Sequence, residues 1–319
     1  MWTPIETDAA DLIHDVSYDY YGRRMAACSS DRTLKIFDVD AAGAWQMTDS
    51  WKAADASILE CVWAHPEHGQ VVACCSLDRT VRIFEETGGE GKRWVERARL
   101  VDARAAVHDI WFAPQHQGLR LASVAADGIV RIYEALEPNN LSHWTLMDDF
   151  SVLDGSGGED DGEMAVVKMP PRESEASFCL TWCPSRFAQP SLAVGSMDTV
   201  RLYVQDGASG KWRPAGEISH PALIRDITWA PSMGRSWHQL ATACKDGHVR
   251  IFKLVESEGR WQTQCIGDFD DHGQPVWRVS FNVTGTILSS AGDDAKIRLW
   301  KSSYGGQFAC TSVVSMIQS

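Results

Sequence analysis

The sequence predicts an all-β fold, a β-propeller with six blades. A unit ending in aspartate and a V-R-I-F-type strand recurs six times, and successive aspartates lie 47, 49, 71, 48 and 48 residues apart. A period of 40–50 residues built from short alternating strands is typical of propeller blades. Apolar and charged side chains alternate along the V-R-I-F strands, as on a β-strand, and no segment has helical periodicity.

Each copy begins with an inner strand of spaced apolar residues. The triplets are Ile13-Val16-Tyr18, Ile58-Cys61-Trp63, Val107-Ile110-Phe112, Ile224-Ile227-Trp229 and Val276-Val279-Phe281, and the weaker fourth copy keeps Leu180 and Trp182. A second strand follows, such as MAACSS or VVACCS, then the aspartate and the third strand. The loop before the fourth copy is longer than the others and acidic, and we expect a flexible loop at about 154–176.

The repeated aspartates are predicted to close the turn between the second and third strands. They are Asp31, Asp78, Asp127, Asp198, Asp246 and Asp294. A carboxylate in such a turn can accept hydrogen bonds from backbone N–H groups and from histidine.

Two histidines, His220 and His272, each precede an inner strand by four residues. We expect Asp294, His272, Ser290 and Trp300 to form the internal hydrogen-bonded set of a WD-repeat blade. A His–Asp–Ser trio also occurs in nucleophilic catalysis. The structural interpretation is favoured because its parts recur from blade to blade, which catalytic residues do not.

A tryptophan marks the outer, fourth strand in five copies, and Phe308 takes its place in the sixth. The tryptophans are Trp45, Trp94, Trp144, Trp212 and Trp261. The segment WTPIETD, opened by Trp2, has the spacing of a seventh outer strand, which leaves one outer strand without a blade.

An uncovered strand edge is a liability unless something pairs with it. The count therefore predicts an open ring that a partner completes by β-augmentation. The predicted partner-binding edge is Trp2, Thr3, Ile5 and Thr7. A six-bladed ring in which this segment merely packs outside is the alternative.

Composition excludes several functions. The net charge of −13 argues against a nucleic-acid partner, and no apolar run suggests membrane insertion or a signal peptide. We expect one domain over residues 1–319, with reduced, buried thiols among its nine cysteines. The glycine-rich pieces GGEGK and GASGK lack phosphate-loop spacing and are predicted turns. No catalytic, cofactor or metal motif is found, so we expect a protein that is not an enzyme.

Several stretches exceed a generic repeat consensus, among them VWAHPEHGQVVACCSLDRT, WAPSMGRSWHQLA and QPVWRVSFNVTGTILSSAGDDAKIRLWK. They resemble the Seh nucleoporins, small WD-repeat propellers of the nuclear pore Y complex that are related to the COPII coat propeller Sec-thirteen. The resemblance covers nearly the whole chain, from about Leu12 to Thr311. The fourth copy departs from it, because its turn is one residue shorter and the preceding loop is long and acidic.

The resemblance implies a structural scaffold subunit at the nuclear envelope that supports nucleocytoplasmic and mRNA transport. It implies that an α-helical nucleoporin donates the missing blade and that other Y-complex subunits bind. It also implies membership of a vacuolar or lysosomal coat-like complex in amino-acid and TOR signalling.

A protein of another class could have the same fold: a WD-repeat adaptor that reads peptides, such as a ubiquitin-ligase substrate receptor. Such an adaptor typically carries W-D-x-R after the third strand, and no copy here does. The arginines of the third strands also lie one per copy rather than in one cluster.

Overall fold

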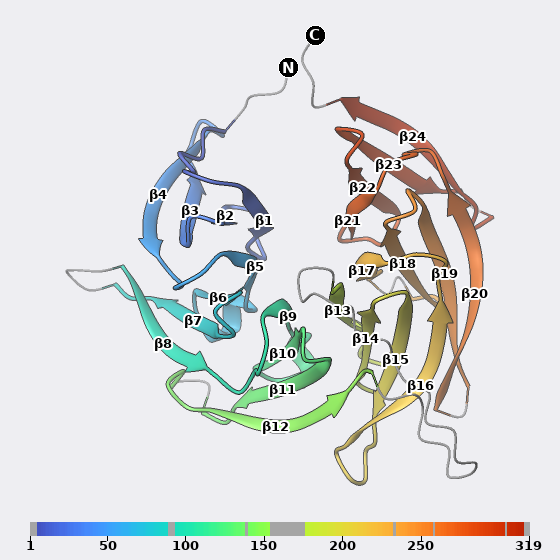
Figure 1. Cartoon of the computed structure of the whole chain (residues 1–319), viewed down its shortest axis with the longest axis horizontal. Coiled ribbons are helices and arrows are strands. Elements are labelled where there is room, and N and C mark those ends of the chain that lie inside the picture. Colours follow the sequence, from blue (N-terminus) through green and yellow to red (C-terminus); the bar gives the residue numbers. More distant parts are fainter. Residues whose placement is uncertain are drawn as a thin grey trace. The chain divides into compact units, whose positions relative to one another are not determined.

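Six antiparallel sheets of four strands make up the described chain (Figure 1). The computed structural model describes residues 5–88, 93–137, 140–153, 176–231, 234–257, 259–303 and 305–315. Helical structure in these ranges is limited to two short 3₁₀ turns, Pro66–His68 and Gln115–Gln117. The predicted all-β fold with six propeller blades is confirmed. None of the helices described has the length and apolar character of a membrane span.

The chain divides into two compact units, residues 1–149 and 150–319, and each contains three blades. In the first unit, blade one is β1 (Ile13–Tyr18), β2 (Arg24–Ser29), β3 (Thr33–Val39) and β4 (Trp45–Lys52). Blade two is β5 (Ile58–Trp63), β6 (Val71–Ser76), β7 (Val81–Glu86) and β8 (Trp94–Leu100). Blade three is β9 (Val107–Phe112), β10 (Arg120–Ala125), β11 (Ile129–Ala135) and β12 (Trp144–Ser151).

The second unit repeats the plan. Blade four is β13 (Phe178–Trp182), β14 (Ser191–Ser196), β15 (Thr199–Gln205) and β16 (Trp212–Ser219). Blade five is β17 (Ile224–Trp229), β18 (His238–Cys244), β19 (Val249–Ser257) and β20 (Arg260–Phe269). Blade six is β21 (Val276–Phe281), β22 (Ile287–Gly292), β23 (Lys296–Ser302) and β24 (Phe308–Ser315). Every predicted triplet lies on a first strand, and every marker aromatic lies at or next to the start of a fourth strand.

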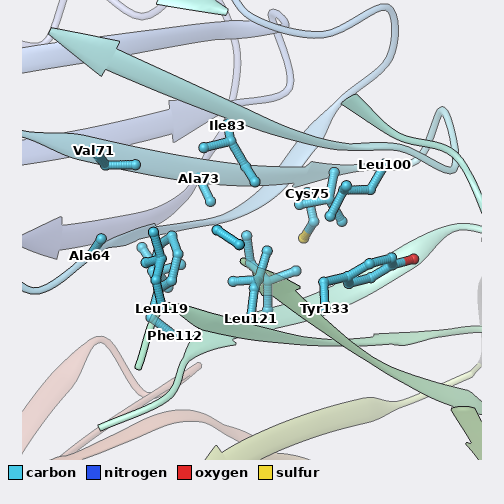
Figure 2. Packing of buried hydrophobic residues seen from close by; sticks show 14 of the residues in the cluster. Ala64, Val71, Ala73, Cys75, Ile83, Leu100, Phe112, Leu119, Leu121 and Tyr133 are labelled. Carbon is cyan, nitrogen blue, oxygen red and sulfur yellow. The ribbon is translucent and has the colours of Figure 1, made fainter. Parts of the chain in front are cut away.

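The core consists of apolar layers between successive blades. Between blades two and three, side chains of β6 and β7 such as Cys75 and Ile83 face Leu121 and Tyr133 of the next blade (Figure 2). The alternation of the strands places these residues on one sheet face, and burial on that face is the main source of stability. Each blade therefore needs a neighbour to bury its inner strand.

A carboxylate on the inner strand ties a blade to its successor. Asp226 of β17 accepts the backbone N–H of Val279 on β21 at 2.8 Å, and Asp15 of β1 accepts that of Cys61 on β5 at 3.2 Å. A register irregularity just before each carboxylate interrupts the pairing with the second strand. Hydrogen bonds to an ionised acceptor are stronger than neutral ones, so these contacts hold neighbouring inner strands together.

The six repeated aspartates all lie between the second and third strands of their blades, as predicted. In four blades the aspartate also pairs with the arginine four residues later. The Nη2-to-carboxylate distance is 2.9 Å for Arg82–Asp78, 2.7 Å for Arg131–Asp127 and 2.8 Å for Arg250–Asp246, and Arg298 pairs with Asp294 in the same way.

Burial alone would raise the pKa of these carboxyl groups. For Asp78, hydrogen bonds from Thr80 and from the backbone of Asp55, together with the charge of Arg82, outweigh burial and lower the pKa. These pairs were not predicted, although aspartate and arginine stand four residues apart in each of the four copies.

His272 lies at the centre of a buried hydrogen-bonded set in blade six. Its Nδ1 is 2.9 Å from Asp294 Oδ1 and its Nε2 is 2.8 Å from Ser290 Oγ. Ser290 Oγ also accepts the indole N–H of Trp300 at 2.9 Å. Because Ser290 is 1% exposed, its hydroxyl cannot meet a substrate, so the set is structural.

His220 makes different contacts in blade five. Its Nε2 is 3.0 Å from Thr242 Oγ1, and its Nδ1 is 3.3 Å from the carbonyl oxygen of Ile218. Both ring nitrogens are thus engaged away from Asp246, which bonds to Arg250 and to the backbone of His248. Blade five therefore lacks, among these contacts, the histidine–aspartate hydrogen bond that blade six has.

The buried histidines predict a loss of stability in mild acid. Burial is the main cause that lowers the pKa of both His220 and His272 below the usual value near 6.5. A group whose pKa is lower in the folded state contributes stability above the unfolded pKa and loses it as pH falls. We expect urea unfolding to give a lower free energy of unfolding at pH 5.5 than at pH 7.5.

The His272→Gln variant should reduce this pH dependence, whereas replacing the exposed His143 with Gln should not. Equal stability of the unmodified chain at the two pH values would contradict the prediction.

Removing the inter-blade carboxylate should be costly. The Asp226→Ala variant leaves the N–H of the buried Val279 without its partner, and an unsatisfied buried donor costs about 1–3 kcal/mol. We expect a loss of that size in chemical denaturation. The Asp226→Asn variant keeps one acceptor oxygen and should lose less; equal stability of wild type and Asp226→Ala would show that the contact is dispensable.

Candidate functional site

The inner strand of blade one is exposed where those of other blades are buried. Ile13, Val16 and Tyr18 are 40%, 43% and 54% exposed. Their counterparts at the first two triplet positions are at most 4% exposed: Ile58, Cys61, Val107, Ile110, Ile224, Ile227, Val276 and Val279. Blade one therefore presents an exposed apolar face, which we name the leading face. Within each unit, the later blades use the same side to contact the blade that precedes them.

The described N-terminal segment packs against part of the leading face. Ile5 contacts a small cluster formed by Met25, Ala27 and Phe37, together with Trp45. This apolar contact covers the outer half of the face. The β1 triplet remains exposed.

Polar contacts fix the same segment on blade one. Lys35, which replaces the third-strand arginine, donates through Nζ to the carbonyl oxygen of Thr7 at 2.8 Å and also to that of Asp8. The N–H of Ala10 donates to Asp31 Oδ2 at 3.0 Å. Burial would raise the pKa of Asp31, but the hydrogen bonds from Thr33 and Ala10 and the charge of Lys35 lower it overall.

These contacts repeat those that link a blade to its predecessor. The connector after β4 places the N–H of Asp55 2.9 Å from Asp78 Oδ2, and the connector after β8 places that of Arg104 3.1 Å from Asp127 Oδ2. Arg298 likewise bonds a connector carbonyl, that of Asp271. The segment around Ala10 thus follows the path of a connector that leaves the outer strand of a preceding blade.

The predicted outer strand over WTPIETD has no pairing partner in the described chain. Residues 5–9, which include Ile5 and Thr7, are therefore not assigned to a strand. Because the predicted edge pairs with a strand of a partner protein, its part at Ile5 and Thr7 stays a prediction. Trp2 and Thr3 lie outside the described residues, so their part of the predicted edge stays a prediction.

An aromatic pair belongs to the leading face, because Tyr18 packs edge-on against Trp45 with ring centroids 5.6 Å apart. Exposed apolar and aromatic residues gathered on one sheet indicate a protein-binding surface. Tyr20 and Tyr21, both exposed in the turn after β1, pack against each other at 5.3 Å, and Tyr20 meets His65 of the next blade at 4.9 Å.

Blade six has a second incompletely covered face, on the side away from blade five. In blade five the matching face is fully buried against blade six through Ala241, Ala243, Val249 and Ile251. The equivalent cross-strand pairs of blade six are Ser289 with Leu299 and Ala291 with Ile297, and all four residues are only partly buried. We name this surface the trailing face.

The other sequence candidates carry no chemistry in the described residues. The GASGK piece at 207–211 is a turn held by Asp206, which accepts hydrogen bonds from Ser209. Residues 89–92 of GGEGK and 154–175 of the expected acidic loop lie outside the described residues. All nine cysteines are free, and seven of them are buried.

The chain is similar to known proteins over almost its full length. The family described as WD domain, G-beta repeat matches residues 4–38, 47–85 and 263–301. Nucleoporin seh1 of Schizosaccharomyces pombe is 48% identical over 98% of this chain and 96% of its own length. Nucleoporin SEH1 of Saccharomyces cerevisiae is 40% identical over 99% of both chains, and that of Homo sapiens is 41% identical over 97% of this chain and 87% of its own.

Identity at this level over whole chains, together with six blades of WD-repeat type, confirms the resemblance found in the sequence. The chain belongs to the Seh1 family of nucleoporins.

Proposed function

We propose that this protein is a structural subunit of the nuclear pore outer ring, the Y complex, located at the nuclear envelope. In this role it binds an α-helical scaffold nucleoporin that donates the missing blade, and it contacts other Y-complex subunits. Its contribution to nucleocytoplasmic transport, including that of mRNA, is architectural and requires no catalysis.

The exposed inner strand of blade one is the observation that carries this proposal. Ile13, Val16 and Tyr18 occupy positions that a preceding blade buries elsewhere in the chain. A donated three-stranded sheet would bury them, and its third strand would pair with the segment around Ile5 to make a fourth. Main-chain hydrogen bonds would give affinity and the apolar face would give register, as in other β-augmentation complexes.

The same face serves a second proposed assembly, a vacuolar or lysosomal coat-like complex in amino-acid and TOR signalling. Two helical partners that each carry an insertion blade would compete for one leading face. A single copy of the chain could then belong to only one of the two assemblies at a time.

The adaptor alternative finds less support. A peptide receptor needs convergent charged side chains on one face. Here Arg82, Arg131, Arg250 and Arg298 are each engaged by the turn aspartate of their own blade. The remaining third-strand arginine is Arg201, whose Nε lies 3.6 Å from the Glu217 carboxylate.

A charge on the leading face should abolish partner capture. In Val16→Asp, an unpaired carboxylate would be buried on binding, which costs several kcal/mol. We expect loss of the scaffold nucleoporin in affinity purification. Val283→Asp, at another exposed valine on a loop of blade six, is the matched control. Equal recovery of the partner by both variants would place the interface elsewhere.

Deleting residues 2–7 tests the edge strand. The deletion removes Ile5 and the acceptor carbonyl of Thr7 while leaving every blade strand intact. We expect weaker partner binding, measured by quantitative pull-down, with the thermal unfolding temperature only slightly lowered. Unchanged partner binding would exclude a role for the edge.

Solubility should depend on the partner. With the leading face exposed, the chain expressed alone should associate or precipitate, and co-expression with the partner's insertion segment should rescue it. Size-exclusion chromatography with light scattering measures this directly. A stable, soluble monomer without a partner would count against an open ring.

A further inference from the structure

Two cysteines and an aspartate converge where blade one meets blade two. Asp15 lies on β1, Cys28 is its cross-strand neighbour on β2, and Cys61 lies on β5 of the next blade. The two sulfur atoms and a carboxylate oxygen all lie within 4.8 Å of one another. Both cysteines are fully buried, whereas Asp15 is half-buried.

The distances match those between ligands of a tetrahedral metal ion. Cys61 Sγ is 3.8 Å from Asp15 Oδ2 and 3.6 Å from the carbonyl oxygen of Ala26. With metal bonds of about 2.3 Å to sulfur and about 2.0–2.2 Å to oxygen, tetrahedral ligand atoms lie about 3.5–3.8 Å apart. The distances within the set that involve Cys28, all within 4.8 Å, would shorten to this range on binding.

The surroundings carry negative charge. The carboxylates of Asp15 and Glu60 both act electrostatically on the Cys61 thiol. The same field that opposes an isolated thiolate attracts a cation. A bound divalent ion reverses the balance and lets a coordinating thiol lose its proton.

Other blade junctions show that the fold does not require these sulfurs. At the junction of blades five and six, Asp226 makes the same clamp, but its cross-strand neighbour is Ala243 and the facing residue is Val279. At the junction of blades two and three, Cys75 lies opposite Glu60, but Ile110 faces it. Among the described inner strands, only that of blade two brings a second thiol to its predecessor's carboxylate and cysteine.

We propose that Asp15, Cys28 and Cys61 form a binding site for a thiophilic d¹⁰ cation, of which Zn²⁺ is the most available. Binding releases the two thiol protons and forms two metal–thiolate bonds and one metal–carboxylate bond. The carbonyl oxygen of Ala26 stands beside Cys61 as a fourth ligand. The ion would join three strands of two blades where blade one meets blade two.

Metal titration of the full chain tests the site. The reduced protein is stripped with chelator, incubated with one equivalent of Zn²⁺ and desalted, and its zinc content is measured. Co²⁺ then serves as a probe, because thiolate ligands give an ultraviolet charge-transfer band. We expect one ion per chain, a higher thermal unfolding temperature with Zn²⁺ than with chelator, and a charge-transfer band.

Matched variants separate the site from ordinary buried thiols. Cys28→Ala and Cys61→Ala should each abolish the charge-transfer band and the thermal shift. The Asp15→Asn variant keeps both sulfur atoms and serves as a control for misfolding. It should weaken Zn²⁺ binding about 10-fold or more. Cys75→Ala removes a thiol packed beside Ile83 and Leu100 (Figure 2) and should leave both signals unchanged.

Two results would overturn the proposal. One is zinc content well below one ion per chain with no thermal shift, which would leave the thiols as hydrogen-bonded core residues. The other is equal loss of signal in Cys75→Ala and Cys28→Ala. Partner capture through the leading face, measured on the Asp15→Asn variant, is a separate readout, so failure of the metal site leaves the scaffold proposal standing.

Discussion

The structure depends on the burial of one blade's inner strand by the preceding blade. A four-stranded sheet has two faces, and an antiparallel sheet this short cannot stand alone with both faces apolar. In blades two, three, five and six the first two inner-strand triplet residues are almost completely buried, and a carboxylate joins the inner strands at two junctions. Blade one has the same strand, the same turn and the same outer tryptophan, yet its triplet has no comparable cover. The difference lies in what precedes it along the chain.

The N-terminal segment covers part of the face that a preceding blade would otherwise bury. It supplies a single aliphatic side chain, Ile5, and a few backbone hydrogen bonds to Lys35 and Asp31. These contacts cover Met25 and Phe37 but cannot replace the β-branched and small residues that a second and third strand would contribute. The lysine at position 35, in place of arginine, fits this task because a compact ammonium group can bind two adjacent carbonyl oxygens.

The repeat period, the strand order, the aspartate turns and the outer-strand aromatics could all be predicted because each is a local pattern copied six times, with Phe308 in place of tryptophan in the sixth copy. The set around His272 could be predicted for the same reason, since its members lie at fixed positions in one blade. The contacts of His220 with Thr242 and Ile218 could not be predicted, because they depend on side-chain geometry within blade five. The edge expected over residues 5–7 stays a prediction, because strand structure requires a pairing partner and the described chain does not supply one. Cys28 and Cys61 come together through a tertiary contact between two blades, and no spacing in the sequence predicts that contact.

Exposure of Ile13, Val16 and Tyr18 has a consequence for the cell as well as for assembly. A copy of the chain without a partner displays the kind of apolar surface that chaperones and degradation machinery recognise. Its lifetime would then depend on how much partner is present, and surplus copies would be removed without any dedicated regulator. The uncovered strand would in this way set the dosage of the subunit to match that of the scaffold.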